Sequence, residues 1–279
     1  MDNNHLDNFI TYGLKRRSTV TRETYKAALL HFELFLRTRK LVLDNFTKQD
    51  VQDYLDAMEG EGKAPATIHK HFYALRAYSK WIKRKTLTED IRLIHLPDVK
   101  KIKPETLSKE ERQALVAMAS ENKRNVAIIL LFLGAGLSVS ELVTLNRCDV
   151  RLENNRGTII IHKRNAEKTR EVAIGPMIRQ ALSDYLFERE DDHSALFISN
   201  RDRPISTRSV QMIIKKYGGD KLRATVLRHT FISAMVQGEE DWSVIQKQAG
   251  LITPQMLPRY AKPTKVQIQE VADRLFDEE

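Results

Sequence analysis

The feature that most constrains the fold of this chain is a break in its helical pattern at residues 96–103. This stretch reads LPDVKKIK, Pro104 follows it directly, and its charged side chains replace regularly spaced apolar ones. Proline and irregular spacing disfavour helices and strands, so the stretch predicts a linker. A chain of 279 residues has room for about two domains of ~100–150 residues each. We therefore expect two domains, 1–95 and 107–279, joined by a linker at 96–106.

The part before the break shows helical spacing of apolar residues in successive segments. Residues 21–40 place apolar side chains three and four apart and so predict one amphipathic helix. Thr47–Asp50 resembles a helix start with an acidic residue in the first turn, and that second helix should end near Gly60–Gly62. A third helix is expected at 66–85 and a short one before Lys15. The first domain is therefore expected to be all-helical.

The predicted helix at 66–85 has two different faces. Its inward positions are Ile68, Phe72, Leu75, and either Trp81 or Ile82. The outward positions at which we expect contact with DNA are His69, Lys70, Tyr73, Arg76 and Lys80. Basic side chains with interleaved aromatic ones are typical of a helix that faces nucleic acid.

Positive charge is concentrated in the first part of the chain. Residues 1–104 contain 20 Lys and Arg against 13 Asp and Glu, whereas residues 105–279 contain 26 against 24. Lys and Arg that neutralise phosphates release condensed counterions, so this excess favours a polyanionic partner. The same charges could serve only to keep the surface solvated, and net charge does not decide between the two.

The part after the break combines helices with a small β-hairpin. Ser108 and Glu111 form the pattern of a capping box, which starts a helix at 108–119, and a second helix at 124–135 is apolar almost all round and so should be central. Two β-prone runs, 158–161 and 171–174, are joined by a charged turn at 162–170. Further helices are expected at 176–187, 207–217, 226–237, 242–249 and 264–276. The predicted fold class is mainly α, with a small β-hairpin or sheet in the second domain.

Composition excludes several classes of protein. The single cysteine, Cys148, cannot form an internal disulfide or a Cys-rich zinc site, so we expect a reducing compartment and no metal. The longest apolar run, Val126–Leu137, is well short of the ~20 residues that span a bilayer. The polar start MDNNHLDN does not resemble a signal peptide. We therefore expect a soluble cytoplasmic protein without a membrane partner.

The most specific motif lies between Leu227 and Tyr260. Leu-Arg-His-Thr-Phe begins at Leu227, Gly250 follows, and Tyr260 stands ten residues after that glycine. Upstream, residues 134–142 read GAGLSVSEL. These residues resemble the two motifs of the tyrosine recombinase (phage integrase) family, and the predicted hairpin lies between them, where the family places a catalytic lysine. The first domain looks like the family's core-binding domain, so the resemblance covers nearly the whole chain.

The resemblance implies a reaction on double-stranded DNA that needs no metal and no cofactor. In the family, a tyrosine attacks a phosphodiester and forms a 3′-phosphotyrosine, two arginines hold the nonbridging oxygens, and a lysine protonates the leaving oxygen. By position, the resemblance assigns the nucleophile to Tyr260 and the second arginine to Arg228, which should also bind DNA. Lys163 is the best match for the hairpin lysine, with Lys168 as its rival.

Three family positions hold other residues. Ser138 stands where the family has its first arginine, Thr225 where it has a histidine, and Leu251 where it has histidine or tryptophan. Losing one preorganised oxyanion donor costs on the order of 3–4 kcal/mol, and losing a proton-transfer group costs a factor of ~10²–10⁴ in rate. Cleavage should therefore be close to abolished, unless a nearby cation such as Arg124 or Arg147 enters the site.

Three functions are compatible with these observations. The first is a sequence-specific DNA-binding protein that has lost strand cleavage and acts as a transcriptional regulator or repressor of a phage or mobile element, located on the nucleoid. The second is an active, divergent site-specific recombinase or integrase with Tyr260 as nucleophile. The third is a protein-interaction module. The predicted C-terminal helix carries a narrow apolar stripe and could mediate self-association through Val266, Ile268, Val271 and Leu275.

Overall fold

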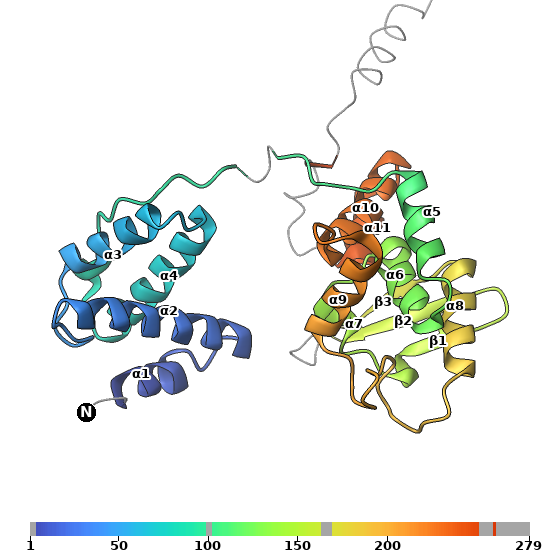
Figure 1. Ribbon diagram of the computed structural model, residues 1–279, viewed down its shortest axis with the longest axis horizontal. Helices are drawn as coiled ribbons and strands as arrows, with labels where there is room; N and C mark the ends of the chain where they lie inside the picture. The colour runs from blue at the N-terminus through green and yellow to red at the C-terminus, as the bar shows by residue number, and fades with distance from the viewer. Residues whose placement is uncertain (1–3, 99–101, 163–168, 251–258, 261–279) are drawn as a thin grey trace, which may run out of the picture. The chain divides into compact units, whose positions relative to one another are not determined.

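A computed structural model describes residues 4–98, 102–162, 169–250 and 259–260, and the chain divides into two compact units, Met1–Asp98 and Val99–Glu279 (Figure 1). Lys163, Lys168, Leu251 and the predicted helix 264–276 lie outside the described residues. Each unit is described by itself below.

The first unit consists of helices. They are α1 (Asn4–Asn8) with a following π-helical turn (Phe9–Gly13), α2 (Thr19–Thr38), α3 (Lys48–Gly60), α4 (Pro65–Trp81) and a 3₁₀ turn (Lys85–Thr88). Local chemistry explains their starts: Ser18 caps α2, Thr47 and Asp50 form a capping box on α3, and Pro65 occupies the first turn of α4.

Helices α2 and α4 end earlier than the sequence pattern predicts. The chain turns out of each helix at a residue with left-handed backbone, Lys40 at φ 60° and Lys83 at φ 61°. After α4, the backbone NH of Arg84 donates to the carbonyl of Ser79 at 2.8 Å, which closes the last turn. The predicted extension of these helices to residues 40 and 85 was therefore wrong by two and four residues.

The core of the first unit is rich in aromatic rings. Phe32, Phe46, Tyr54 and Tyr78 are almost completely buried. Of the two alternatives for the inward position at the end of α4, Ile82 packs against this core, whereas 41% of Trp81 is exposed.

The second unit combines helices with a three-stranded antiparallel sheet. In chain order these are α5 (Lys109–Met118), α6 (Lys123–Ala135), α7 (Val139–Leu142), a 3₁₀ turn (Arg147–Asp149), β1 (Val150–Leu152), β2 (Gly157–His162), β3 (Thr169–Ala173), α8 (Pro176–Phe187), α9 (Thr207–Gly218), α10 (Ala224–Gln237) and α11 (Trp242–Ala249). The strand order is β1-β2-β3, with Ile159 paired to Val150 on one side and Val172 on the other. The predicted fold class, mainly α with a small β element, is confirmed.

Strand β1 and helix α7 were not expected from the sequence. They span three and four residues, too few to show a period of apolar side chains. β1 forms by pairing with β2, and α7 forms on the capping box of Ser138 and Glu141.

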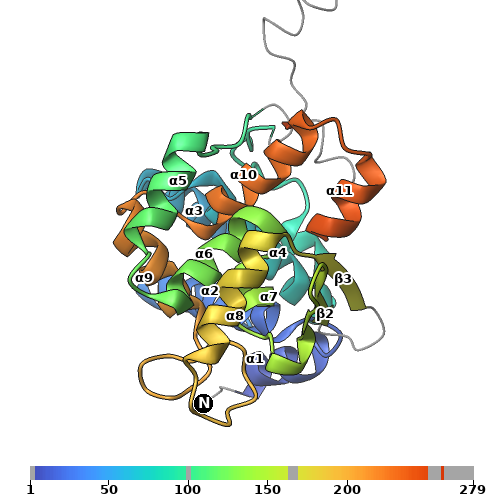
Figure 2. The same ribbon diagram turned by 90° about the vertical axis from the view of Figure 1, so that its right-hand side faces the viewer.

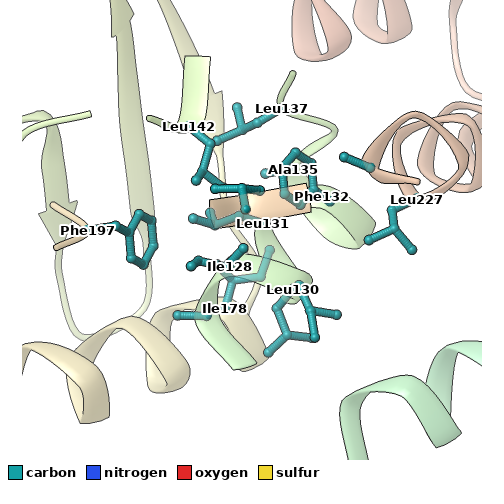
Figure 3. Packing of buried hydrophobic residues seen from close by; sticks show 14 of the residues in the cluster. Ile128, Leu130, Leu131, Phe132, Ala135, Leu137, Leu142, Ile178, Phe197 and Leu227 are labelled. Carbon is teal, nitrogen blue, oxygen red and sulfur yellow. The ribbon is translucent and has the colours of Figure 1, made fainter. Parts of the chain in front are cut away.

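Helix α6 is the centre of the second unit, as its apolar sequence predicts. Ile128, Leu131 and Phe132 are fully buried, and α8 and α10 pack against α6 (Figure 2). Figure 3 shows Ile178 of α8 and Leu227 of α10 reaching this cluster from their own helices. This packing holds the start of α10 against the end of α6 and so positions Arg228, the residue after Leu227.

Candidate functional site

Arg228 lies where two helices end. Its guanidinium donates hydrogen bonds to the carbonyl of Gly136, the C-cap of α6, and at 2.5 Å to the carbonyl of Ala249, the last residue of α11. Helix C-termini carry partial negative charge, so both ends stabilise a cation at this place. The side chain of Arg228 is 16% exposed, and burial lowers its pKa, an effect that the nearby Glu141 carboxylate opposes.

Gly136 allows the ring of Phe231 to pack against the end of α6. Its φ is +60°, in the left-handed region, and a Cβ atom there would overlap the ring of Phe231. The glycine of the first motif and the Phe of the second therefore lie directly against each other.

Glu141 connects the groups of the site. Its Oε2 accepts hydrogen bonds from the backbone NH of Ser138 at 2.7 Å and from the Ser138 hydroxyl at 2.8 Å, and it lies 3.7 Å from Nη1 of Arg228. Its Oε1 accepts a hydrogen bond from Arg170. Burial by itself would raise the pKa of Glu141, but the hydrogen bonds from Arg170 and Ser138 outweigh it and lower the pKa, so the group is a carboxylate.

Ser138 acts in this structure as the N-cap of α7. Its side chain accepts from the backbone NH of Glu141 and completes a capping box. It therefore stabilises a helix start, and its hydroxyl brings no positive charge to the position where the family has its first arginine.

A second guanidinium reaches the site from strand β3. The side chain of Arg170 is only 8% exposed, pairs with Glu141 and lies against Gly250. The proposed substitutes lie elsewhere: Arg124 donates to the carbonyl of Ile198, and Arg147 pairs with Asp191. Each of these two arginines is held by its own partners, so neither takes the place of the family's first arginine in this structure.

Arg170 could have been found from the sequence. It precedes Val172 and Ile174 at intervals of two, and both of those residues are buried. Side chains two apart in a strand share a face, so the strand pattern points Arg170 inward. Assigning Arg170 to the turn at 162–170 hid this signal, since β3 begins at Thr169.

Tyr260 is far from Arg228 in the sequence but lies near it in the fold. Its hydroxyl is 2.5 Å from Nδ1 of His229, and its ring packs with the small cluster that includes Phe231 and Ala249. Burial raises the pKa of Tyr260, an effect that the charges of Arg259 and Arg228 reduce. Burial and the same two arginines lower the pKa of His229, which favours the neutral ring that shares a hydrogen bond with the phenol.

His229 was quoted in the sequence motif but given no role. Its contact with Tyr260 joins two residues that are 31 positions apart, which motif spacing does not reveal. Thr225, three positions before Arg228 on α10, is exposed and supplies no ring to this site.

The basic face of α4 is largely exposed. Lys70, Tyr73, Arg76 and Lys80 all point to solvent within the first unit. His69 differs, since it is half-buried and its Nε2 donates to the carbonyl of Ile94 at 2.7 Å. That hydrogen bond holds the segment after α4 in place. His69 therefore has a structural role within the first unit, unlike the four exposed residues of this face.

Two observations bear on other classes of site. Within the described ranges, no three His, Cys, Asp or Glu side chains come together as a metal ion would require. Among those same residues, no helix combines the length and the apolar character needed to cross a bilayer.

Comparison with known proteins agrees with this geometry. The model of the phage integrase family matches residues 105–266, and that of the phage integrase N-terminal SAM-like domain matches residues 6–86. The chain is 28% identical to the tyrosine recombinase XerA of Pyrococcus furiosus over 82% of this chain and 80% of that protein, and 26% identical to XerC of Bacillus subtilis over 85% and 83%.

Solved structures show the same fold. The XerH site-specific recombinase bound to a palindromic difH substrate matches with a TM-score of 0.71 at 21% identity, covering 96% of this chain and 83% of that chain. A lambda integrase dimer bound to a COC′ core site matches with a TM-score of 0.68 at 16% identity, covering 90% and 95%. Together with the family models, these likenesses show that the chain belongs to the phage integrase family of tyrosine recombinases.

Proposed function

We propose that this protein binds a specific duplex DNA site through its tyrosine recombinase fold and cleaves that site very slowly or not at all. The observation that carries the proposal is the role of Ser138, whose side chain caps α7 at the position of the family's first arginine. Thr225 likewise offers no imidazole for proton transfer. Binding depends on contacts spread over many residues, whereas chemistry needs every member of one small cluster.

A protein that occupies a DNA site without cutting it blocks other proteins there. We therefore propose a regulatory role of the repressor type, on a phage or other mobile element, exerted at the nucleoid in the cytoplasm. Support for this step comes from the family membership and from the altered catalytic positions.

One contact favours the alternative, an active divergent recombinase. The hydroxyl of Tyr260 lies 2.5 Å from the neutral ring of His229, which is the arrangement that a nucleophile and its base require. An active protein would use His229 for the proton transfer that Thr225 does not supply.

A nicked suicide duplex distinguishes the two functions. The duplex is selected from a random 40-bp library by the wild-type protein, and a nick beside each candidate phosphate lets the cleaved strand diffuse away and trap a covalent complex. We expect a shift in mobility of intact DNA and no complex that survives denaturation. A covalent complex that forms with wild type and not with Tyr260→Phe would overturn the proposal and establish the recombinase.

We also propose self-association through the C-terminal segment. An apolar groove of about 640 Å³ lies between α5, α6 and the start of α8, lined by Val116, Leu130, Leu133, Met177 and Ile178 among others. The stripe of Val266, Ile268, Val271 and Leu275 has matching chemistry. Deleting residues 264–279 should reduce cooperative binding to DNA, as measured by sedimentation of the complexes. A truncated protein that stays folded and fully cooperative would refute this contact.

A further inference from the structure

The site around Glu141 contains more positive charge than the single carboxylate of Glu141 neutralises. Arg170 and Arg228 both lie within ion-pair distance of this one carboxylate, so the three groups together carry a net charge of about +1. Both guanidiniums are largely buried, at 8% and 16% side-chain exposure. A buried excess charge is costly unless an anion binds beside it.

Arg170 also has hydrogen-bond donors to spare. Its Nη1 is engaged by Glu141, whereas its Nε and Nη2 are buried without an acceptor among the described residues. Buried donors are nearly always satisfied in proteins, so these two nitrogens point to a ligand that brings oxygen atoms. Nε and Nη2 lie on one edge of the planar guanidinium, which matches the paired oxygens of a phosphate.

We propose that Arg170 binds a backbone phosphate of DNA together with Arg228 and so supplies the guanidinium that position 138 lacks. This proposal rests on the proposed DNA-binding function and names the group that the site holds. Glu141 and Gly250 are positioning residues: Glu141 accepts from Arg170, and the absence of a side chain at position 250 leaves room for its guanidinium.

A phosphodiester fits this site better than a carboxylate side chain of a partner protein. It carries one negative charge, which equals the excess at the site, and its tetrahedral oxygens can accept from two guanidiniums at once. It is also the repeating group of duplex DNA, the partner in the proposed function.

The test compares Arg170→Gln, Arg170→Lys and the control Arg151→Gln. Arg151 is an exposed arginine on β1 of the same sheet, so its replacement removes the same charge outside the site. The probe is the 40-bp duplex selected by the wild-type protein, and affinity is measured by fluorescence anisotropy over a range of salt. A second set of duplexes carries a neutral methylphosphonate at one phosphate at a time.

We expect Arg170→Gln to lower affinity at least tenfold and to reduce the slope of log affinity against log salt by about one, whereas Arg151→Gln changes both little. One methylphosphonate should weaken the wild type at least tenfold and weaken Arg170→Gln clearly less, since only Arg228 still holds that phosphate in the variant; a general loss of folding would not produce this difference. Arg170→Lys keeps the charge and the pairing with Glu141, so it should fold and show an intermediate loss.

Two results would overturn the inference in different ways. In the first, wild type binds its duplex, but both Arg170 variants bind as Arg151→Gln does, or no methylphosphonate position distinguishes them from wild type. Arg170 then does not hold a phosphate, and the proposed function stands. If Arg170→Gln does not fold, Arg170→Lys and the methylphosphonate series decide alone. A wild-type protein that selects no duplex from the library would remove the proposed function and this inference with it.

Discussion

The guanidinium of Arg170 lies so close to Gly250 that a Cβ atom at position 250 would be 2.6 Å from its Cζ. Gly250 also has a φ of +63°, in the region that residues with a side chain rarely adopt. The glycine that ends α11 therefore does two things at once, since it turns the chain and leaves space for the buried cation of β3.

Gly250→Ala should disturb both functions of this glycine. We expect it to lower the free energy of unfolding by roughly 1–2 kcal/mol from the left-handed backbone alone, with a further loss from displaced Arg170. Urea unfolding, followed by Trp242 fluorescence in a Trp81→Phe background, reports on the second unit. Gly175→Ala is the matched control within the second unit, because nothing lies within 4 Å of its Cβ position and its φ is −74°. Equal stability of the two variants would contradict the crowding around Gly250.

Tyr260→Phe and Arg228→Gln should have different effects on DNA binding. Phenylalanine keeps the packing against Phe231 and removes only the hydroxyl that contacts His229, so affinity should stay within about twofold. Arg228→Gln removes charge-assisted hydrogen bonds worth roughly 1.5–3 kcal/mol each, which corresponds to a loss of at least tenfold. Anisotropy titration checks both. A large loss of affinity with Tyr260→Phe would show that the phenol itself contacts DNA.

The basic face of α4 should contribute to affinity through phosphate contacts. Changing Lys70, Arg76 and Lys80 together to alanine should weaken binding and reduce the salt slope by about two to three. The control triple changes Lys40, Lys48 and Lys63, which are exposed lysines of the first unit outside α4. If both triples have the same slope, α4 does not face the DNA.

The stability of the first unit should fall in mild acid because of His71. Its Nδ1 lies 2.7 Å from the hydroxyl of Tyr54, which also contacts His31, and burial, with the neighbouring His31 and Lys70, lowers the pKa of His71 from 6.5 to about 4. The unfolded chain therefore binds a proton at a pH where the folded chain does not. The free energy of unfolding of the first unit is therefore highest above pH 6.5. It falls by on the order of 2–3 kcal/mol as the pH is lowered toward 4.

Urea unfolding at pH values from 7 to 4, followed by Trp81 fluorescence in a Trp242→Phe background, measures this loss. His71→Gln should flatten the pH dependence, while His5→Gln, at an exposed position of α1, should leave it unchanged. The same pH profile in His71→Gln as in wild type would assign the acid sensitivity to other groups.

Local features of this protein could be predicted from its sequence because their causes are local. The capping boxes of Thr47 and Ser108 start their helices as expected, and the all-round apolar pattern of 124–135 places α6 at the centre. The family motifs consist of short runs and fixed spacings along the chain, so they identify the fold and single out Arg228 and Tyr260. Helix ends were less accurate, since they depend on left-handed residues such as Lys83 that no apolar period reports.

The sequence by itself therefore determined the helical elements, the fold family and the two retained side chains, Arg228 and Tyr260. Tertiary structure alone decided which groups surround them. Arg170 reaches Glu141 because the register of β3 turns its side chain inward, and His229 meets Tyr260 because α10 and the end of the described chain pack together. Such contacts join residues far apart in the chain, and their geometry follows from the packing of α6, α10 and the sheet, which no local pattern encodes.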